Sequence, residues 1–152
     1  MKKIVALLLL AALAGAGYFY FDKSTAPEFV LEEGYRYLYD GKSLDGWRVI
    51  GGESTFKAEG ESIVGRAGPG KNTFLRTTNS YGDFSLKLQV RWDEPGNSGV
   101  QFRSHEQNAN GRAFGYQYEL DPSERAWTGG IYDEARRGWL ANLENNPQAR
   151  SA

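Results

Sequence analysis

The chain has no cysteine, which excludes disulfide bonds, cysteine-ligated zinc, a thiol nucleophile and an acylated lipoprotein N-terminus. It has one histidine, His105. Neither sign of charge is in excess, because 18 Lys and Arg face 19 Asp and Glu, so no basic surface for nucleic acid is predicted. No segment before Asp133 repeats its apolar residues with the 3.6-residue period of an amphipathic helix.

Glycine and aromatic residues are abundant instead: 19 Gly, 4 Trp, 9 Tyr and 8 Phe. Aromatic residues favour strands and glycine favours turns, so this composition indicates a β-rich protein. A length of 152 residues is enough for one domain with a core of its own.

The N-terminus resembles an export signal. Two lysines precede an apolar run from Ile4 to Phe21 that contains small residues, so cleavage after Ala14 or Ala16 is expected. The alternative is an uncleaved membrane anchor formed by this same run, residues 4–21. In either case we expect an exported protein, periplasmic or extracellular, that touches a membrane only through such an anchor. Residues 1–21 are then the signal or anchor, 22–34 a polar linker and 35–152 the folded domain.

Short alternating segments between turn signals predict strands over residues 35–39, 55–58, 62–66, 74–77, 83–93, 98–104 and 116–121. The turn Glu59-Gly60 predicts a hairpin, and Asp83–Asp93 has the clearest alternation. Regularly spaced strands without helices predict an antiparallel sandwich or barrel. Its core should comprise the side chains on the apolar strand faces: Phe84, Leu86, Leu88, Val90, Val100, Phe102, Tyr118 and Leu120.

The strand that ends at Asp121 carries an amide and two carboxylates on one face, because Gln117, Glu119 and Asp121 alternate with apolar residues. Carboxylates at positions i and i+2 lie about 6.5–7 Å apart at ~3.3 Å per residue. Pairs at such a separation can act as acid and base on one small substrate. A solvated outer face of a half-buried strand is the alternative. By the same parity Gln101 and Arg103 share a face of the preceding strand.

Three aromatic residues, Trp127, Tyr132 and Trp139, follow in predicted loops. An aromatic ring can stack on the C–H surface of a sugar while polar groups bind its hydroxyls. Each ring taken alone is explained by packing, but together with the ordered amide and guanidinium groups they favour a carbohydrate cleft. We expect this cleft to be lined by Arg103, Gln117, Glu119 and Asp121, with Tyr132 at its rim and Asn97 reaching it from a loop.

Four stretches together resemble the 3-keto-disaccharide hydrolase domain family, over roughly residues 35–140: Tyr39-Asp-Gly-Lys-Ser-Leu-Asp-Gly-Trp47, Gly96-Asn-Ser-Gly-Val-Gln-Phe-Arg103, Gly115-Tyr-Gln-Tyr-Glu-Leu-Asp-Pro-Ser123 and Thr128-Gly-Gly-Ile-Tyr-Asp-Glu134. The resemblance implies a concanavalin A-like jelly-roll β-sandwich. Relatives continue through several more strands beyond Gln148–Ala152, so it also implies a domain truncated at its C-terminus. Many relatives have Glu at the position of Gln117 and Gln at the position of Glu119.

The resemblance further implies cleavage of glycosides whose glucose carbon 3 has been oxidised to a ketone. A carboxylate would remove the acidic hydrogen from carbon 2, the glycosidic oxygen would leave carbon 1, and water would add. On this basis Asp121 or Glu119 is the expected base and Arg103 the enolate stabiliser, with His105 either the acid or an ordinary loop residue. The expected substrate-binding residues are Asn97, Gln101, Gln117, Trp127 and Tyr132.

Three further possibilities stay open. A divalent metal held by Glu119 and Asp121 could replace the arginine as electrophile, although no residue spacing requires a metal or another cofactor. A laminarinase-type glycoside hydrolase places two glutamates around an aspartate on one strand, and Gln117 stands where the first of them would be. A non-catalytic carbohydrate-binding or cell-surface module is the third possibility. In each reading the expected partner is a small carbohydrate.

Overall fold

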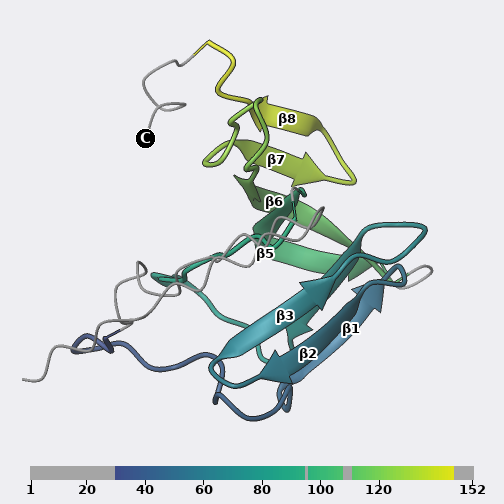
Figure 1. Cartoon of the computed structure of the whole chain (residues 1–152). Coiled ribbons are helices and arrows are strands. Elements are labelled where there is room, and N and C mark those ends of the chain that lie inside the picture. Colours follow the sequence, from purple (N-terminus) through teal and green to yellow (C-terminus); the bar gives the residue numbers. More distant parts are fainter. Residues whose placement is uncertain (1–29, 95, 108–110, 146–152) are drawn as a thin grey trace, which may run out of the picture. The chain divides into compact units, whose positions relative to one another are not determined.

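The computed structural model describes residues 30–94, 96–107 and 111–145, which contain eight β-strands and no helix (Figure 1). Two units are distinguished, Met1–Tyr37 and Leu38–Ala152, and all strands of the described residues lie in the second. The prediction of an all-β protein is therefore confirmed. In chain order the strands are β1 (Trp47–Gly51), β2 (Thr55–Glu59), β3 (Ser62–Arg66), β4 (Thr73–Thr77), β5 (Ser98–Gln107), β6 (Arg112–Leu120), β7 (Ile131–Glu134) and β8 (Gly138–Ala141).

All strand pairs are antiparallel. Strands β5, β6, β7 and β8 form one sheet in that order, while β1 pairs with β4 and β2 with β3. The β2–β3 hairpin forms at the predicted turn, where Glu59 pairs with Ser62 and leaves a two-residue loop. Gly60 in this loop has a φ of 58°, the left-handed conformation that tight hairpin turns require. Several antiparallel sheets without helices are consistent with the predicted β-sandwich.

The strand predicted over residues 35–39 is wrong, because residues 30–46 of the described chain form no strand. The Asp40 carboxylate accepts hydrogen bonds from the backbone N–H groups of Lys42 at 2.8 Å and Ser43 at 2.9 Å, which turns the chain here. Strand β1 begins after Gly46, whose φ is 83°, and pairs with β4 along its whole length. The alternating apolar residues before Asp40 therefore have no ladder to join.

The strand predicted over Asp83–Asp93 is also wrong, although its alternation is the clearest in the sequence. This segment belongs to none of the sheets in the described chain. Its apolar side chains are largely exposed: Phe84 is 53% exposed, Leu86 40%, Leu88 49% and Val90 45%. Alternation gives a segment one apolar face, but a strand also needs a neighbour with which to exchange hydrogen bonds.

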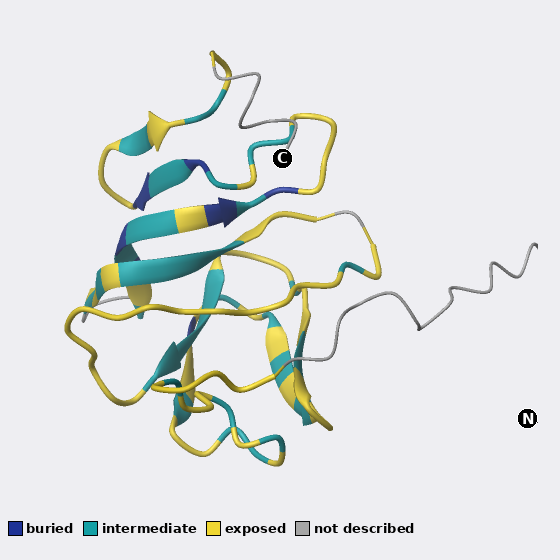
Figure 2. Ribbon diagram, turned by 90° about the vertical axis from the view of Figure 1, so that its left-hand side faces the viewer, coloured by how far each residue is buried: buried dark blue, intermediate teal, exposed yellow. Residues whose placement is uncertain are grey.

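Buried residues, dark blue in Figure 2, are few in the described chain. More of them are acidic than hydrophobic, so the predicted apolar core is not the buried part. Tyr118 of β6 is 43% exposed, whereas its neighbour Glu119 is 2% exposed, so the acidic face of β6 is the buried one. The other predicted core residues of β5 and β6 (Val100, Phe102 and Leu120) are only partly buried. The buried hydrophobic residues are Ile50 and Ala113, and the buried charged residues are Glu119, Asp121, Asp133 and Glu134.

The predicted export signal or anchor over residues 4–21 lies outside the described residues. Within the described ranges there is no helix that is long and apolar enough to cross a membrane. Export of the protein stays a prediction.

Candidate active site

One face of the four-stranded sheet collects the side chains of the candidate site. Gln117 on β6 lies opposite Gln101 on β5 and opposite Tyr132 on β7, since these residues are register partners. Residues two apart on a strand share a face, so Glu119 joins this face from β6 and Glu134 from β7. The antiparallel register therefore brings polar side chains from three strands onto one surface.

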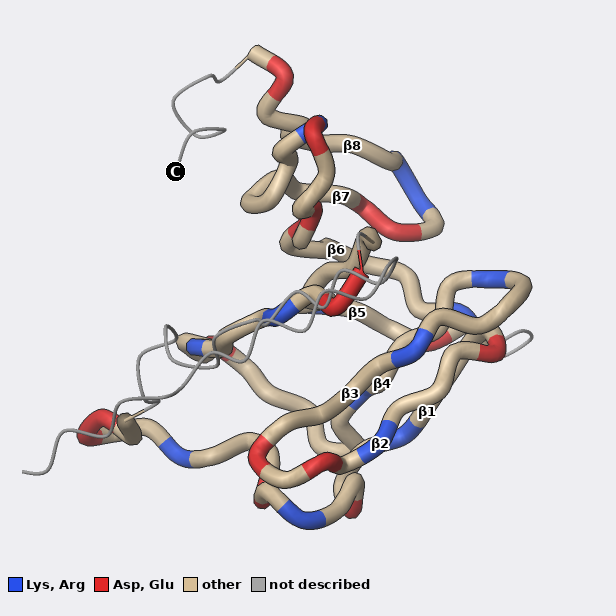
Figure 3. The backbone as a smooth tube through the Cα atoms, viewed as in Figure 1, with Lys and Arg blue, Asp and Glu red and all other residues tan. Residues whose placement is uncertain are grey.

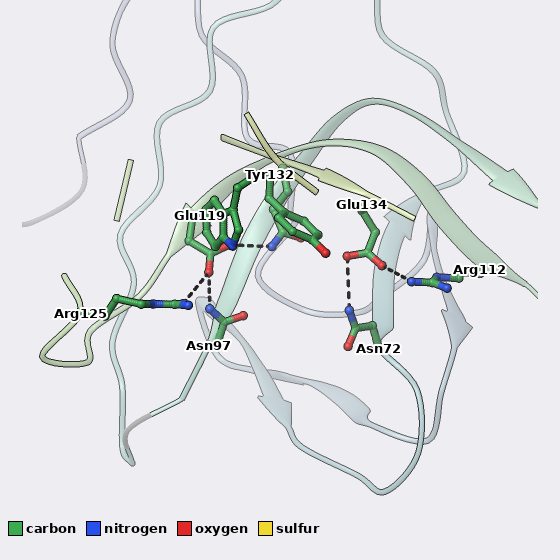
Figure 4. Close-up of a pocket in the computed structure, with 9 residues that line it drawn as sticks. Asn72, Asn97, Arg112, Glu119, Arg125, Tyr132 and Glu134 are labelled. Carbon is green, nitrogen blue, oxygen red and sulfur yellow. Dashed lines mark hydrogen bonds and ion pairs between the residues drawn. The ribbon is translucent and has the colours of Figure 1, made fainter. Parts of the chain in front are cut away.

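A pocket of about 310 Å³ opens here and combines amide, guanidinium, carboxylate and aromatic groups (Figure 4). A volume of this order suits a small ligand. Sugars match such a lining, since their hydroxyls need both donors and acceptors while an aromatic ring can cover their C–H surface. The lining residues are Asn72, Asn97, Arg112, Gln117, Glu119, Arg125, Tyr132, Glu134 and Trp139.

Glu119 is the most heavily hydrogen-bonded side chain of this pocket. Its Oε2 accepts a hydrogen bond of 3.0 Å from Gln117 Nε2. Its Oε1 accepts one from Asn97 Nδ2 and a longer one, 3.4 Å, from Arg125 Nη2 (Figure 4). Backbone hydrogen bonds of Glu119 with Gly129 and Gly130 hold the end of β6 against the following loop. The carboxylate is thus buried, fully partnered and directed into the pocket.

Asp121 follows β6 and does not line the pocket, but it forms an ion pair with Arg125, which does. Its Oδ2 accepts a hydrogen bond of 2.7 Å from Arg125 Nε, and its Oδ1 accepts one of 3.1 Å from the backbone N–H of Ser123. Burial by itself would raise the pKa of Asp121. The hydrogen bonds from Ser123 and Arg125 and the positive charge of Arg125 outweigh burial, so the pKa lies below its ordinary value. Asp121 is therefore a carboxylate at neutral pH.

The lowered pKa of Asp121 predicts that the protein loses stability in acid. A group whose pKa is lower in the folded state stabilises the fold above its unfolded pKa, near 3.8, and this contribution disappears as the pH falls through the folded value. Asp121→Asn should therefore lower the melting temperature at neutral pH, and the gap to the wild type should close below pH 3.8. Thermal unfolding of both proteins across this range measures the gap. A gap of constant size would contradict the prediction.

Glu134 is a second buried carboxylate in the pocket and is not among the site residues predicted from the sequence. Its Oε1 accepts a hydrogen bond of 2.9 Å from Arg112 Nη2, and its Oε2 accepts one of 3.4 Å from Asn72 Nδ2. Figure 4 shows this cluster on the other side of Tyr132 from Glu119. The signal was present, because Glu134 is two residues after Tyr132 and therefore shares its face on any strand.

Asp133 lies between Tyr132 and Glu134 on β7, so its side chain is on the opposite face of the sheet. It is fully buried, and its two oxygens accept hydrogen bonds from Arg136 Nε at 2.7 Å and Arg137 Nε at 2.6 Å. Burial would raise the pKa of Asp133, but the hydrogen bonds from Arg137 and Arg136 outweigh it and lower the pKa. Arg137 also donates to the Tyr116 hydroxyl at 3.2 Å. This ion cluster closes the turn between β7 and β8, where acidic and basic segments adjoin in Figure 3.

Arg103 does not share a cleft with Gln117 and Glu119, so that prediction is wrong. A β-bulge interrupts the register between Phe102 and His105, and Arg103 within it has a φ of 46°. The extra residue breaks the alternation on which the prediction depended. Arg103 forms an ion pair with Asp83. Together with His105 it lines a separate pocket of about 440 Å³.

The remaining predicted binding residues have protein partners. Gln101, beside Gln117 on the neighbouring strand, does not line the pocket, and its Nε2 donates to Gln117 Oε1 at 3.2 Å. Trp127 also lies outside the lining, and the guanidinium of Arg125 lies over its ring, 4.3 Å from the centroid. Trp139 lines the pocket and packs edge to face against Trp127, with 4.8 Å between the ring centroids.

Glu119 and Asp121, considered above as metal ligands, share Arg125 between them, with contacts of 3.4 and 2.7 Å. Within the part of the chain that the structure describes, no group of three or more His, Asp or Glu side chains is placed to hold a metal ion. The guanidinium of Arg125 places a positive charge in contact with Glu119.

The fold and the pocket together define an all-β protein whose site suits a small polyhydroxylated ligand. Residues 34–151 match the family of the 3-keto-alpha-glucoside-1,2-lyase-like domain, which covers most of the chain. The chain therefore belongs to this family, which confirms the resemblance found in the sequence. A search of the curated proteins found no match.

Proposed function

We propose that the protein cleaves 3-keto-glycosides by elimination, with Glu119 as the base. The observation that carries the proposal is the buried Glu119 carboxylate, which is directed by three donor side chains into a pocket lined by Tyr132 and Trp139. The family description supports the choice of substrate, since it refers to 3-keto-alpha-glucosides and to a 1,2-lyase.

The chemistry follows from the ketone at carbon 3, which acidifies the hydrogen on carbon 2. Glu119 takes this proton, and the electrons of the C–H bond form an enolate with its charge on the carbon 3 oxygen. The ketone then re-forms, a double bond develops between carbons 1 and 2, and the aglycone oxygen leaves carbon 1 and takes a proton from water. Addition of water across the new double bond completes a net hydrolysis.

The test compares a 3-keto-glucoside with the same glucoside before oxidation. The protein should cleave only the oxidised compound, because the unoxidised sugar has no acidic hydrogen on carbon 2. Released aglycone and the ultraviolet absorbance of the enone product report the reaction. Cleavage of the unoxidised glucoside would contradict the proposal and favour a laminarinase-type hydrolase.

The second candidate is a non-catalytic carbohydrate-binding module. It is favoured by one observation: both oxygens of Glu119 already accept hydrogen bonds from protein side chains, as expected of a rigid binding surface. Calorimetric binding of either sugar without release of aglycone would support this candidate over the enzyme.

A further inference from the structure

Arg125 occupies a central position in the pocket that the sequence did not indicate. It comes from the loop between β6 and β7, and its guanidinium contacts two buried carboxylates, Asp121 through Nε at 2.7 Å and Glu119 through Nη2 at 3.4 Å. These two contacts use two of the five N–H groups of an arginine. The side chain remains 41% exposed and lines the pocket, so a ligand can reach it.

The loop that carries Arg125 is tightly held. The Thr128 hydroxyl accepts a hydrogen bond from the Asp121 N–H at 2.8 Å and donates one to the Asp121 carbonyl at 3.0 Å. Gly129 N donates to the Glu119 carbonyl at 3.0 Å, which fastens the far end of the loop to β6. Arg125 thus reaches back over the end of the strand that carries the base.

Two aromatic rings and one carboxylate fix the direction of the guanidinium. Its carbon lies 4.3 Å from the ring centroid of Trp127 and 5.5 Å from that of Trp139. A cation over an aromatic face is attracted by the ring quadrupole, more strongly where water is displaced. Asp121 binds Nε, the edge of the guanidinium nearest the backbone, so the terminal nitrogens face Glu119 and the pocket.

We propose that Arg125 is the catalytic cation that stabilises the enolate and that Asp121 is its positioning residue; this inference rests on the proposed elimination. Removal of the carbon 2 proton by Glu119 places negative charge on the oxygen of the adjacent carbon 3. A cation that already contacts the base lies beside this oxygen. A preorganised donor directed at a developing charge is among the largest contributions to catalysis. Arginine also remains protonated beside a ketone at any physiological pH.

Arg125→Ala tests the assignment in the full chain with a 3-keto-glucoside. We expect kcat to fall about 10²–10³-fold, the loss typical for one stabilising donor, with a smaller change in KM. Exchange of the carbon 2 hydrogen in deuterium oxide should slow by the same factor. Low concentrations of guanidinium chloride should restore part of the lost rate, whereas sodium chloride should not.

Arg136→Ala is the matched control. Arg136 also donates from Nε to a buried aspartate at 2.7 Å and is 39% exposed, but it lies outside the pocket lining. Its substitution should leave kcat within threefold of the wild type and should give no response to guanidinium. Asp121→Asn should lower kcat less than Arg125→Ala does, with an unchanged KM, because Arg125 is present but less well directed.

Each outcome decides between supporting and overturning the assignment. Unchanged kcat in a folded Arg125→Ala, or an equal loss in Arg136→Ala, overturns the role of Arg125 while the proposed elimination stands. Absence of elimination and of hydrogen exchange in the wild type overturns both. If Arg125→Ala does not fold, Arg125→Lys serves instead, because it keeps a cation but lacks the planar fork. A fall in kcat of tenfold or more then supports the assignment, and an unchanged kcat overturns it.

Discussion

Substitution of Glu119 by glutamine is expected to reduce the elimination rate by about 10³-fold or more, the contribution typical of a well-placed general base. Glutamine has the same shape but cannot take up the carbon 2 proton. The fold should survive, because the amide oxygen of glutamine can take the place of Oε1 as acceptor from Asn97, while the Gln117 amide can turn so that its oxygen accepts from the new NH2 group. Steady-state kinetics with a 3-keto-glucoside measure the loss, and circular dichroism checks the fold.

Glu134→Gln separates a specific role of Glu119 from a general effect of removing a buried carboxylate. Glu134 pairs in register with Gly115, four residues before Glu119 on β6, or about 13 Å away along the strand at ~3.3 Å per residue. A group this far from the base contacts a different part of the ligand, so its substitution should raise KM more than it lowers kcat. A larger loss of kcat in Glu134→Gln than in Glu119→Gln would show that the base is misassigned.

Local alternation in the sequence is sufficient to predict part of the site. A strand of period two must place Gln117 and Glu119 on one face, and the structure does place both in one pocket. Tyr132 was predicted at the rim of the cleft from a loop, whereas it lies on β7 in register with Gln117. The prediction for Gln117 and Glu119 succeeds because it depends only on backbone geometry within one regular element.

Arg103 and Arg125 show where such reasoning ends. The alternation of side chains predicts Arg103 in the pocket, but the bulge between Phe102 and His105 changes the face on which it lies. No residue pattern in this sequence predicts the bulge. Arg125 enters the pocket from a loop, and its position depends on hydrogen bonds to Asp121 that form only when the loop closes. Contacts between a loop and a strand end are tertiary features that periodicity does not encode.

Burial shows a different limit. An amphipathic strand has two faces, and alternation does not reveal which one the rest of the molecule covers. On β6 the covered face carries Glu119, whose partners compensate for its desolvation, while Tyr118 on the apolar face is 43% exposed. For Asp83–Asp93, alternation predicts an apolar and a polar face but does not show whether a neighbouring strand is present to pair with it. The antiparallel all-β class could be predicted, because that prediction requires knowing neither which face of a strand is buried nor which strand is its neighbour.

Gly115→Ala should be strongly destabilising. Gly115 is buried on β6 with a φ of 146°, where a side chain is strained, and an added Cβ would lie 2.3 Å from Ser104 Oγ and 2.6 Å from Ser104 Cα. Because the second contact is with backbone, the clash is not relieved by a rotamer change. Backbone strain and overpacking each cost about 1–3 kcal/mol, so the free energy of unfolding should fall by about 2–6 kcal/mol. Denaturant titration measures this loss.

Gly82→Ala is the control for Gly115→Ala, since its added Cβ would meet nothing within 4 Å and the change should stay within about 0.5 kcal/mol. Similar values for the two variants would contradict the prediction.

The consequence of Gly115→Ala should extend to the base. Ser104 Oγ donates to Gln101 at 2.7 Å, Gln101 donates to Gln117 at 3.2 Å, and Gln117 donates to Glu119 at 3.0 Å. Displacement of Ser104 therefore disturbs a chain of hydrogen bonds that ends on the Glu119 carboxylate. At temperatures where the variant remains folded, we expect a lower kcat on a 3-keto-glucoside. A folded Gly115→Ala with wild-type kcat would show that this chain does not position the base.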